Sequence, residues 1–251
     1  GLVNIQYVIY NDEVYVIEVN PRSSRTIPYI SKVTGVPMVE IATRMMFGEK
    51  LRDQGYGIGL YPDAEYVAVK VPVFSFEKLH DVDTLLGPEM KSTGEVLGIA
   101  RTFDEALYKG LLAAGYKMKH EGGVLVTVRD TDKQEVVPIV EKYEKLGFKI
   151  YATAGTALTL NQNMIAANTI RKIEEEEPNI MTLFDENKID YIITTSKKGR
   201  KPQRHSVQMR RRAVERSIVT MTALDTANAL ANSLMTNRSV NDIELVDITT
   251  I

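Results

Sequence analysis

Residues 124–161 read VLVTVRDTDKQEVVPIVEKYEKLGFKIYATAGTALTLN, with two short apolar runs on either side of a segment with helical periodicity. The first run, VLVTV, predicts a buried strand because it is brief, continuous and rich in β-branched residues. A helix is expected over 132–146, since its apolar residues recur on one face. These residues are Val136, Val140 and Tyr143. Pro138 fits the interior of a helix poorly, and we expect it to shift the start of this one.

The same alternation continues toward the end of the chain. The expected strands are 148–153, 169–173, 190–195 and 217–221, and the expected helices are 156–161, 178–187, 206–216 and 224–234. Alternating strands and helices are typical of an α/β fold with a doubly wound parallel sheet. Such a sheet binds ligands at the carboxyl ends of its strands. The residues that follow each strand are therefore the first candidates for a site.

Hydroxyl side chains gather at three of these strand ends. Thr127 ends the first strand, and Lys133 lies just beyond it. The second strand ends in TAGT (153–156) and the fourth in TTS (194–196). Hydroxyls, a glycine and a helix N-terminus together favour an anion such as phosphate. One such strand end would carry little weight, because threonine commonly caps helices, but three in one domain predict a phosphate-bearing small molecule.

The first part of the chain has a different pattern. A strand at 3–9, a turn at 11–12 and a strand at 13–20 predict a hairpin. Helical periodicity follows over 27–34 and 37–47. A hairpin alone is marginal in water, and no earlier strand or helix precedes it. We therefore expect the chain to be a C-terminal piece of a larger protein, divided inside a domain.

A glycine-rich loop separates this part from the next elements. Strands are expected at 66–74 and 95–100, and Thr102 with Glu105 predicts a capping box for a helix that ends near 114. The polar, glycine-containing stretch at 117–123 is the expected linker between two domains.

The second predicted strand of the hairpin ends in a candidate site. Glu18 and Asn20 share a face, because residues two apart on a strand point the same way. Two oxygen donors suit a hard cation such as Mg²⁺ or Mn²⁺, and Arg22 and Arg25 could hold anionic oxygens. Metal and arginine together favour phosphoryl transfer. For four residues alone, an exposed strand end with solvated arginines is the simpler interpretation.

The composition of the 251-residue chain is that of a soluble globular protein, with 44% hydrophobic and 25% charged residues. A net charge of −2 provides no field that would recruit nucleic acid or membrane. No apolar run is long enough to span a membrane. The absence of cysteine excludes disulfides and thiolate chemistry and fits a cytoplasmic protein. Three scattered histidines argue against a histidine-rich zinc site.

A basic cluster at 197–212 has eight lysines and arginines among sixteen residues. Nucleic acid could bind such a cluster, but no aromatic residue is interleaved for base stacking. Acidic runs such as 174–177 balance its charge. A solvated helix with phosphate contacts is therefore the favoured interpretation of the cluster, and a solvated face or helix start that of the acidic run.

Three stretches of the sequence resemble parts of a known family. The stretch NIQYVIYNDEVYVIEVNPRSSRT (4–26) looks like the end of the second ATP-grasp unit of carbamoyl phosphate synthetase large subunits. LLGPEMKSTGEVLGIARTFDEALYKGLLAAG (85–115) looks like the segment that follows it. Residues 124–251 look like the family's regulatory domain, of the methylglyoxal synthase-like type. The resemblance implies a truncated ATP-grasp tail of α+β type over 1–118 and an allosteric domain over 119–251.

The resemblance also implies roles for individual residues. Gln6, Glu18 and Asn20 match metal ligands that hold Mg²⁺ or Mn²⁺ on the phosphates of ATP, and Arg22 and Arg25 match arginines that contact the transferring phosphoryl group. The residues that fall on or beside the effector pocket are Thr127, Lys133, Thr153, Gly155, Thr156, Lys172, Thr194, Thr195, Ser196 and Ser206.

Two positions depart from the family pattern. Thr194 stands where asparagine is common, which weakens any statement of how the base or ribose of an effector is read. Val71 stands where ornithine-activated members carry glutamate, which argues against activation by ornithine.

The implied enzyme makes carbamoyl phosphate from bicarbonate, ATP and ammonia that a small glutamine amidotransferase subunit supplies. UMP and IMP are the implied effectors, and a homo-oligomer is possible. Whether the enzyme serves arginine or pyrimidine synthesis stays open, and the chain alone is not expected to be active. Two alternatives remain. One is a stand-alone nucleotide-binding module. The other is a methylglyoxal synthase-type lyase that eliminates phosphate, for which Asp130 or Asp132 with His205 would be the catalytic candidates.

Overall fold

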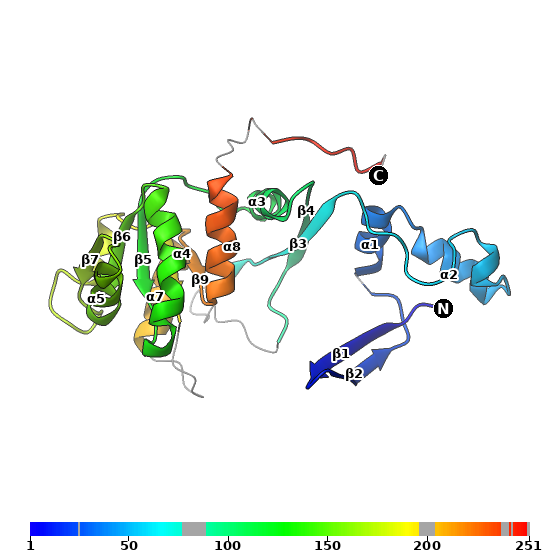
Figure 1. The fold of residues 1–251 in the computed structure, drawn as a ribbon, viewed down its shortest axis with the longest axis horizontal. Coiled ribbons are helices and arrows are strands. Elements are labelled where there is room, and N and C mark those ends of the chain that lie inside the picture. The colour runs from blue at the N-terminus through cyan, green and yellow to red at the C-terminus, as the bar shows by residue number, and fades with distance from the viewer. Residues whose placement is uncertain (25, 77–88, 196–203, 237–240, 242, 250–251) are drawn as a thin grey trace. The chain divides into compact units, whose positions relative to one another are not determined.

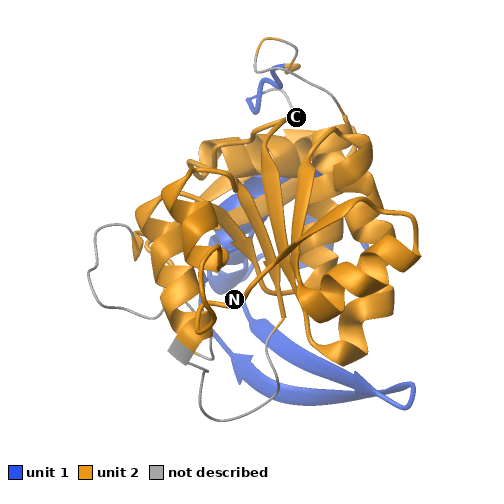
Figure 2. Ribbon diagram, turned by 90° about the vertical axis from the view of Figure 1, so that its left-hand side faces the viewer, with its two compact units in different colours: residues 1–67, 245–251 blue, residues 68–244 orange. Residues whose placement is uncertain are grey.

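The computed structural model describes residues 1–24, 26–76, 89–195, 204–236, 241 and 243–249. These residues form two compact units, which Figure 2 colours separately. The first comprises residues 1–67 with 245–251, and the second comprises residues 68–244. This division by contacts differs from the expected domain boundary after residue 118, and that boundary stays a prediction.

The first unit begins with the expected hairpin of β1 (Asn4–Tyr10) and β2 (Glu13–Asn20), which Figure 1 draws in dark blue. Asn11 and Asp12 both have positive φ, as a two-residue type I′ turn requires. The helices of this unit are α1 (Thr26–Thr34), α2 (Met38–Met46) and the 3₁₀ turn η1 (Leu51–Asp53). The expected hairpin and the two expected helices are therefore confirmed.

A β-bulge divides the hairpin into a polar and an apolar face. Gln6 pairs with Glu18 but Tyr7 pairs with Val16, so Ile17 is an extra residue in β2. Opposed residues of an antiparallel pair share a face. Near its open end the polar face therefore carries Asn4, Gln6, Glu18 and Asn20. The other face carries apolar or aromatic side chains, each at least 36% exposed, which are Ile5, Tyr7, Ile9, Val14, Val16 and Val19.

The second unit begins with a small two-stranded sheet and a helix, namely β3 (Val67–Val73), β4 (Gly94–Ala100) and α3 (Phe103–Ala113). The Thr102 side chain caps α3, because its Oγ1 accepts a hydrogen bond from the backbone N–H of Glu105 at 3.4 Å. Gly98 permits close packing of β4 against α3. A Cβ atom at this position would lie 1.9 Å from the carbonyl oxygen of Ala106.

A five-stranded sheet forms the centre of the second unit. Its strands are β5 (Gly123–Thr127), β6 (Lys149–Thr153), β7 (Ala167–Ile170), β8 (Tyr191–Thr194) and β9 (Val219–Met221). All neighbours are parallel in the order β7-β6-β5-β8-β9. The helices are α4 (Lys133–Lys145), α5 (Ala154–Gln162), α6 (Ile180–Asp185), α7 (Arg204–Glu215) and α8 (Leu224–Met235). The expected doubly wound α/β domain is confirmed.

Helices cover both faces of this sheet, as Figure 2 shows. Val124 and Val126 of β5 pack in one core with residues of α4, α5 and α8, whereas Leu125 packs on the other face with residues of α6 and α7. The strand is therefore buried on both faces, which explains why it appears in the sequence as a continuous apolar run.

Pro138 lies inside α4, which begins at Lys133, so the expected shift of the helix start is wrong. A proline in a helix interior costs about 3 kcal/mol. The three apolar residues of the predicted stripe, all fully buried, each contribute about 1.5–3 kcal/mol. Their burial outweighs the lost backbone hydrogen bond.

In the second unit, β7 and α5 also begin earlier than the sequence pattern indicates, at Ala167 and Ala154. β7 ends before Lys172, although a strand was expected over 169–173. Asn161 fixes the start of β7, since its side chain donates to the carbonyl of Ala167 at 3.1 Å and accepts from its N–H at 3.0 Å. Beyond the strand, Glu175 Oε2 accepts the N–H of Lys172 at 2.7 Å and holds a turn there.

Candidate functional site

The strand-end threonines of the second unit lie at one edge of the sheet. β6 and β8 flank β5 on opposite sides, so the chain reverses its winding direction at β5. Thr127 is paired directly with Thr194, and Thr153 follows Ala152, the partner of Val126. Ligands bind at such a switch point, outside the carboxyl ends of the strands. The fold therefore brings together the hydroxyls that the sequence pattern singled out.

A cavity of about 710 Å³ opens at this edge. The predicted effector residues that line it are Thr127, Lys133, Thr153, Gly155, Thr156, Lys172, Thr194, Thr195 and Ser206. Ser196, the remaining predicted residue, lies outside the described residues. The cavity also has acidic residues and a histidine in its wall, namely Asp130, Glu174, Glu175 and His205.

Three of the threonines in the cavity wall are buried. Thr153, Thr156 and Thr194 are 7%, 1% and 7% exposed. Within the described part of the chain, their side chains make no hydrogen bond. Thr153 is the N-cap residue of α5, yet its side chain makes no capping bond. None of the three hydroxyl oxygens is among the buried unpartnered polar atoms of the described residues, so each can be reached from the cavity and is available to a ligand.

Backbone groups add donors at the same place. α5 begins at Ala154, two residues before the expected start, so Gly155 lies in its first turn. The first N–H groups of a helix have no acceptor within the helix, and the helix dipole favours negative charge there. The Lys133 ammonium lies above this turn, because a Cβ atom on Gly155 would be 2.6 Å from Lys133 Nζ. Lys133 also forms an ion pair with Asp130 at 2.6 Å.

A polar network supports the loop that follows β5. The Nε–H of Arg129 donates to both carboxylate oxygens of Asp132, at 2.8 and 2.7 Å. The backbone N–H of Arg129 donates to Thr195 Oγ1 at 3.0 Å, which connects this loop to the end of β8. The hydrogen bond from Arg129 lowers the pKa of the buried Asp132 carboxyl, and the Thr131 hydroxyl lowers it further.

The acid and base candidates for a lyase do not form one catalytic group. The carboxylate of Asp132 is bound by Arg129, whereas Asp130 pairs with Lys133. His205 Nδ1 lies 3.6 Å from Glu174 Oε2, and both side chains are about half exposed. Asp130 and His205 do line the cavity, but each already faces a charged neighbour.

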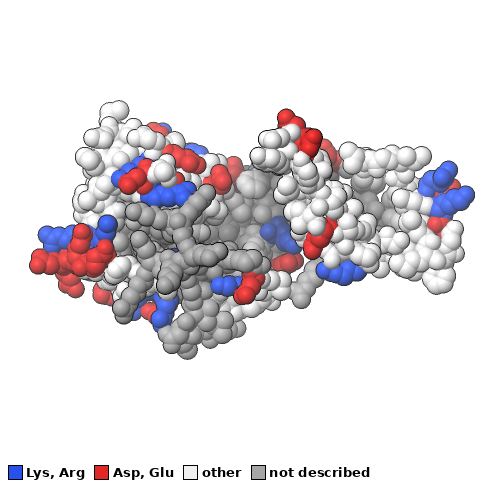
Figure 3. Space-filling view, turned by 90° about the horizontal axis from the view of Figure 1, so that it is seen from below, with Lys and Arg blue, Asp and Glu red and all other residues white. Residues whose placement is uncertain are grey.

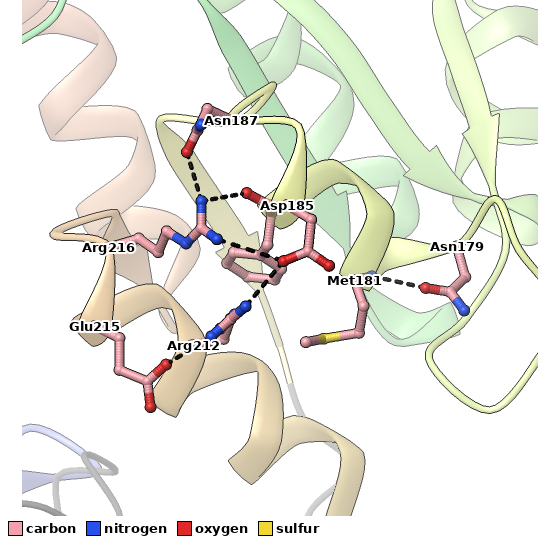
Figure 4. A network of polar contacts seen from close by, with 8 residues as sticks. Asn179, Met181, Asp185, Asn187, Arg212, Glu215 and Arg216 are labelled. Carbon is pink, nitrogen blue, oxygen red and sulfur yellow. Dashed lines mark hydrogen bonds and ion pairs between the residues drawn. The ribbon is translucent and has the colours of Figure 1, made fainter.

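Polar contacts fix the end of α6 against α7, the helix that carries Ser206 into the cavity wall (Figure 4). Arg212 pairs with Asp185 at 2.9 Å and with Glu215 at 3.1 Å. Arg216 donates to Asn187 Oδ1 at 2.6 Å and contacts Asp185 at 3.4 Å. These arginines belong to or follow the basic run of the sequence, and their charges are used inside the fold.

Basic and acidic side chains also alternate on the surface. On the face drawn in Figure 3, those of the described residues lie in mixed clusters. Residues 197–203 of the basic cluster lie outside the described part. Among the described residues, no helix has the length and apolar character needed to cross a membrane.

The hairpin places its predicted ligands together. Gln6 is the cross-strand partner of Glu18, and the Asn20 amide donates to Glu18 Oε1 at 2.9 Å. The donor set is one carboxylate and two amides, all oxygen ligands that suit Mg²⁺ or Mn²⁺. Arg22 is exposed, and its guanidinium contacts the carbonyl of Ser23 at 3.3 Å. Arg25 lies outside the described residues. No group of three or more His, Cys, Asp or Glu suitable for a metal occurs in the described ranges.

Sequence reasoning did not assign the acidic wall of the cavity. Glu174 and Glu175 were interpreted as a solvated run, whereas both line the cavity together with Lys172. Their closeness to a predicted phosphate-binding lysine in the sequence was the available signal. Arg129 was also missed, although its spacing of three residues from Asp132 suits a local ion pair.

Comparisons with known proteins match both parts of the chain. Residues 1–54 match the family described as carbamoyl-phosphate synthase L chain, ATP binding domain, and residues 135–222 match the MGS-like domain. The carbamoyl phosphate synthase large chain of Lachnoclostridium phytofermentans is 50% identical over 248 residues, which are 99% of this chain and 23% of that protein. That of Clostridium botulinum is 50% identical over 233 residues, covering 92% of this chain and 22% of that protein.

The chain thus spans less than a quarter of the length of these curated relatives. A solved structure, that of ForH, aligns with 46% of this chain and 80% of its own at 14% identity and a TM-score of 0.35, a score that does not establish a common fold. The sequence matches are much stronger and agree with the parallel sheet and the hairpin. Over nearly its whole length the chain is therefore similar to a segment of carbamoyl phosphate synthase large chains, with matches to part of their ATP-binding domain and to an MGS-like domain.

Proposed function

We propose that this chain forms part of a glutamine-dependent carbamoyl phosphate synthase. The enzyme would be a ligase that uses ATP, bicarbonate and ammonia from a small glutamine amidotransferase subunit. Support comes from the relatives at 50% identity and from the match to their ATP-binding domain. We also expect the enzyme to be cytoplasmic and to serve arginine or pyrimidine synthesis.

In this enzyme the hairpin would contribute to a phosphoryl-transfer site. Glu18, with Gln6 and Asn20, would hold Mg²⁺ or Mn²⁺ on the phosphates of ATP, because hard cations prefer oxygen ligands. A bound divalent ion neutralises the charge of the phosphate oxygens. Arg22 and Arg25 would hold the anionic oxygens of the transferring phosphoryl group and of carbamate, since guanidinium groups bind such oxygens in pairs.

The second unit would bind a nucleoside monophosphate, UMP or IMP, as an allosteric effector. The observation that carries this proposal is the set of buried threonines in the cavity wall, Thr153, Thr156 and Thr194, whose hydroxyls make no hydrogen bond within the described residues. The phosphate would accept hydrogen bonds from the first turn of α5 and from the hydroxyls of Thr153 and Thr156. Lys133 and Lys172 would supply the positive charge.

The remaining predicted residues would position the rest of the effector. Thr194 and Thr195 at the end of β8, with Ser196 beyond it, would face the ribose or base. Thr127 and Ser206 complete the wall at the end of β5 and on α7. A stand-alone nucleotide-binding module would make the same contacts. Effector binding therefore tests the site, but it does not test the synthesis of carbamoyl phosphate.

Calorimetric titration of the folded chain with UMP and IMP tests the effector site. We expect binding that Lys172→Ala weakens by about 1.5–3 kcal/mol, the range for hydrogen bonds to charged groups. Lys145→Ala is the matched control, because this lysine pairs with Glu141 on α4 and does not line the cavity. It should leave the affinity unchanged.

Two results would contradict the effector site. One is the absence of binding of both nucleotides at millimolar concentration by a chain that circular dichroism shows to be folded. The other is equal affinity of wild type and Lys172→Ala, which would mean that the threonines only terminate strands and cap helices.

A further inference from the structure

Only part of the acidic run 174–177 lines the cavity. All four side chains are exposed, but Glu174 and Glu175 line the cavity, whereas Glu176 and Glu177 do not. Two of four consecutive glutamates therefore lie at the cavity and two lie outside it. This division allows the effect of local charge to be separated from the effect of net charge.

The backbone of this loop is held in a fixed turn. The N–H of Glu175 donates to the carbonyl of Lys172 at 3.1 Å, and the carboxylate of Glu175 accepts the N–H of Lys172 at 2.7 Å. Arg171 donates to the carbonyls of Glu176 and Glu177 at 3.4 and 3.1 Å. The turn places the acidic wall next to Lys172, a lysine proposed to contact phosphate.

Charges around the cavity are balanced. Its described wall contains three basic side chains, Arg129, Lys133 and Lys172, and three acidic ones, Asp130, Glu174 and Glu175. The Nε–H of Arg129 is used by Asp132 and Lys133 pairs with Asp130 at 2.6 Å, so a ligand phosphate meets Lys133 and Lys172 beside carboxylates. Two lysines can neutralise the double negative charge of one phosphate monoester. A second or third phosphate would face carboxylates.

Carboxylates also select for hydrogen-bond donors, because an ionised carboxylate only accepts. Glu174 lies on the cavity wall with His205 Nδ1 at 3.6 Å as a neighbour. The hydroxyls of a ribose, or the N–H groups of a base, could donate to it. Polyphosphate chains offer acceptors only, and they would be repelled.

We propose that Glu174 and Glu175 are specificity determinants of the effector cavity, which restrict it to ligands with one phosphate group and with hydroxyl or N–H donors at the other end. This inference rests on the proposed effector site and adds the class of ligand that the site rejects. In this proposal the two glutamates discriminate between ligands, whereas the threonines and lysines bind the phosphate group that all candidate ligands share.

Titration of the chain with UMP, UDP and UTP, in buffer without divalent cations, tests the inference. We expect UMP to bind about tenfold or more tightly than UTP, as follows from like charges a few ångströms apart near a protein surface. Glu174→Gln should reduce this ratio about three- to tenfold, mainly by improving UTP binding. Glu177→Gln removes the same charge from the same loop outside the cavity and should leave the ratio within about twofold, since salt screens a charge that does not line the cavity.

The outcomes separate this inference from the proposal on which it depends. If no uridine nucleotide binds, the effector site itself fails. If UMP binds and UTP binds equally well or better, the inference is overturned. If Glu174→Gln and Glu177→Gln change the ratio equally, net charge and not the cavity wall discriminates, which also overturns it.

Discussion

At the scale of single residues, Asp132 illustrates how one side chain holds the site loop in place. Its carboxylate accepts two hydrogen bonds from Arg129, whose backbone N–H is bound by Thr195. The ion pair thus holds Arg129 within the loop after β5, and the Arg129 N–H connects that loop to the end of β8. A change at Asp132 should affect the stability of this edge of the sheet, and its effect should depend on pH.

Asp132→Asn should lower the free energy of unfolding by about 1.5–3 kcal/mol at pH 7, the range for hydrogen bonds to charged groups. Because Arg129 lowers the pKa of Asp132 in the folded chain, ionised Asp132 stabilises the fold above its unfolded pKa of about 4. That contribution is lost as pH falls through the lowered folded pKa. Urea denaturation of both proteins from pH 7 to pH 3 should therefore show the difference shrinking at acid pH.

Asp130→Asn is the control for this prediction, since the Asp130 side chain is 86% exposed and should contribute little. A difference between wild type and Asp132→Asn that stays constant between pH 7 and pH 3 would contradict the role assigned to the ionised carboxylate.

At the scale of elements, the approach of β4 to α3 depends on the absence of a side chain. A Cβ atom on Gly98 would lie 1.9 Å from the carbonyl oxygen of Ala106 and 2.5 Å from the backbone nitrogen of Gly110. These are backbone atoms and cannot rotate away, so the helix itself would have to move.

Gly98→Ala should therefore destabilise the second unit by about 1–3 kcal/mol or more, the cost of overpacking. Gly94→Ala on the same strand is the matched control, because a Cβ atom there would meet only the Val73 Cβ at 3.8 Å. Denaturant unfolding would measure the difference in stability between the two variants, as a shift of the midpoint with no change in the dependence of the free energy on denaturant concentration. Equal midpoints for the two variants would show that α3 moves away without cost.

Strand positions could be predicted from sequence where local composition determines them. β5 and β8 are buried on both faces and appear as short apolar runs, so their ends were found within one residue. The position of β7 could not be found in this way, because side chains of Asn161 and Glu175 fix its limits through folded contacts. Likewise, the threonines of the site could be predicted because they lie at strand ends. The acidic wall could not, because its position depends on the path of a loop in the folded chain.

At the scale of the whole molecule, the sheets of the two units differ in how far other elements cover them. The sheet of the second unit is covered on both faces and has the cavity at the carboxyl ends of its strands. The hairpin of the first unit is a two-stranded sheet whose side chains are almost all exposed. Residues 1–54 match the ATP-binding domain of the family, and the predicted metal ligands Gln6, Glu18 and Asn20 all lie on this exposed hairpin.

The chain by itself should therefore show no metal-dependent ATP hydrolysis, because catalysis of phosphoryl transfer depends on complete positioning and charge stabilisation. Phosphate release by the purified chain, with Mg²⁺ or Mn²⁺ present, would measure this, and Glu18→Gln serves as the comparison. An activity that requires metal and disappears in Glu18→Gln would show that the hairpin and its neighbours suffice. Folding of both proteins should be checked by circular dichroism.

The extra residue at Ile17 has a consequence for how this hairpin can vary. Strand side chains alternate with a period of two, so Glu18 and Asn20 would follow Val14 and Val16 in an unbroken count. The extra residue of the bulge interrupts this alternation at Ile17. The carboxylate of Glu18 therefore lies on the face of Gln6, opposite to the face of Val14 and Val16. Substitutions within β2 preserve this parity, but the loss of a single codon would reverse it. Deletion of one residue here would thus exchange the two surfaces of the strand without altering the chemistry of any remaining side chain.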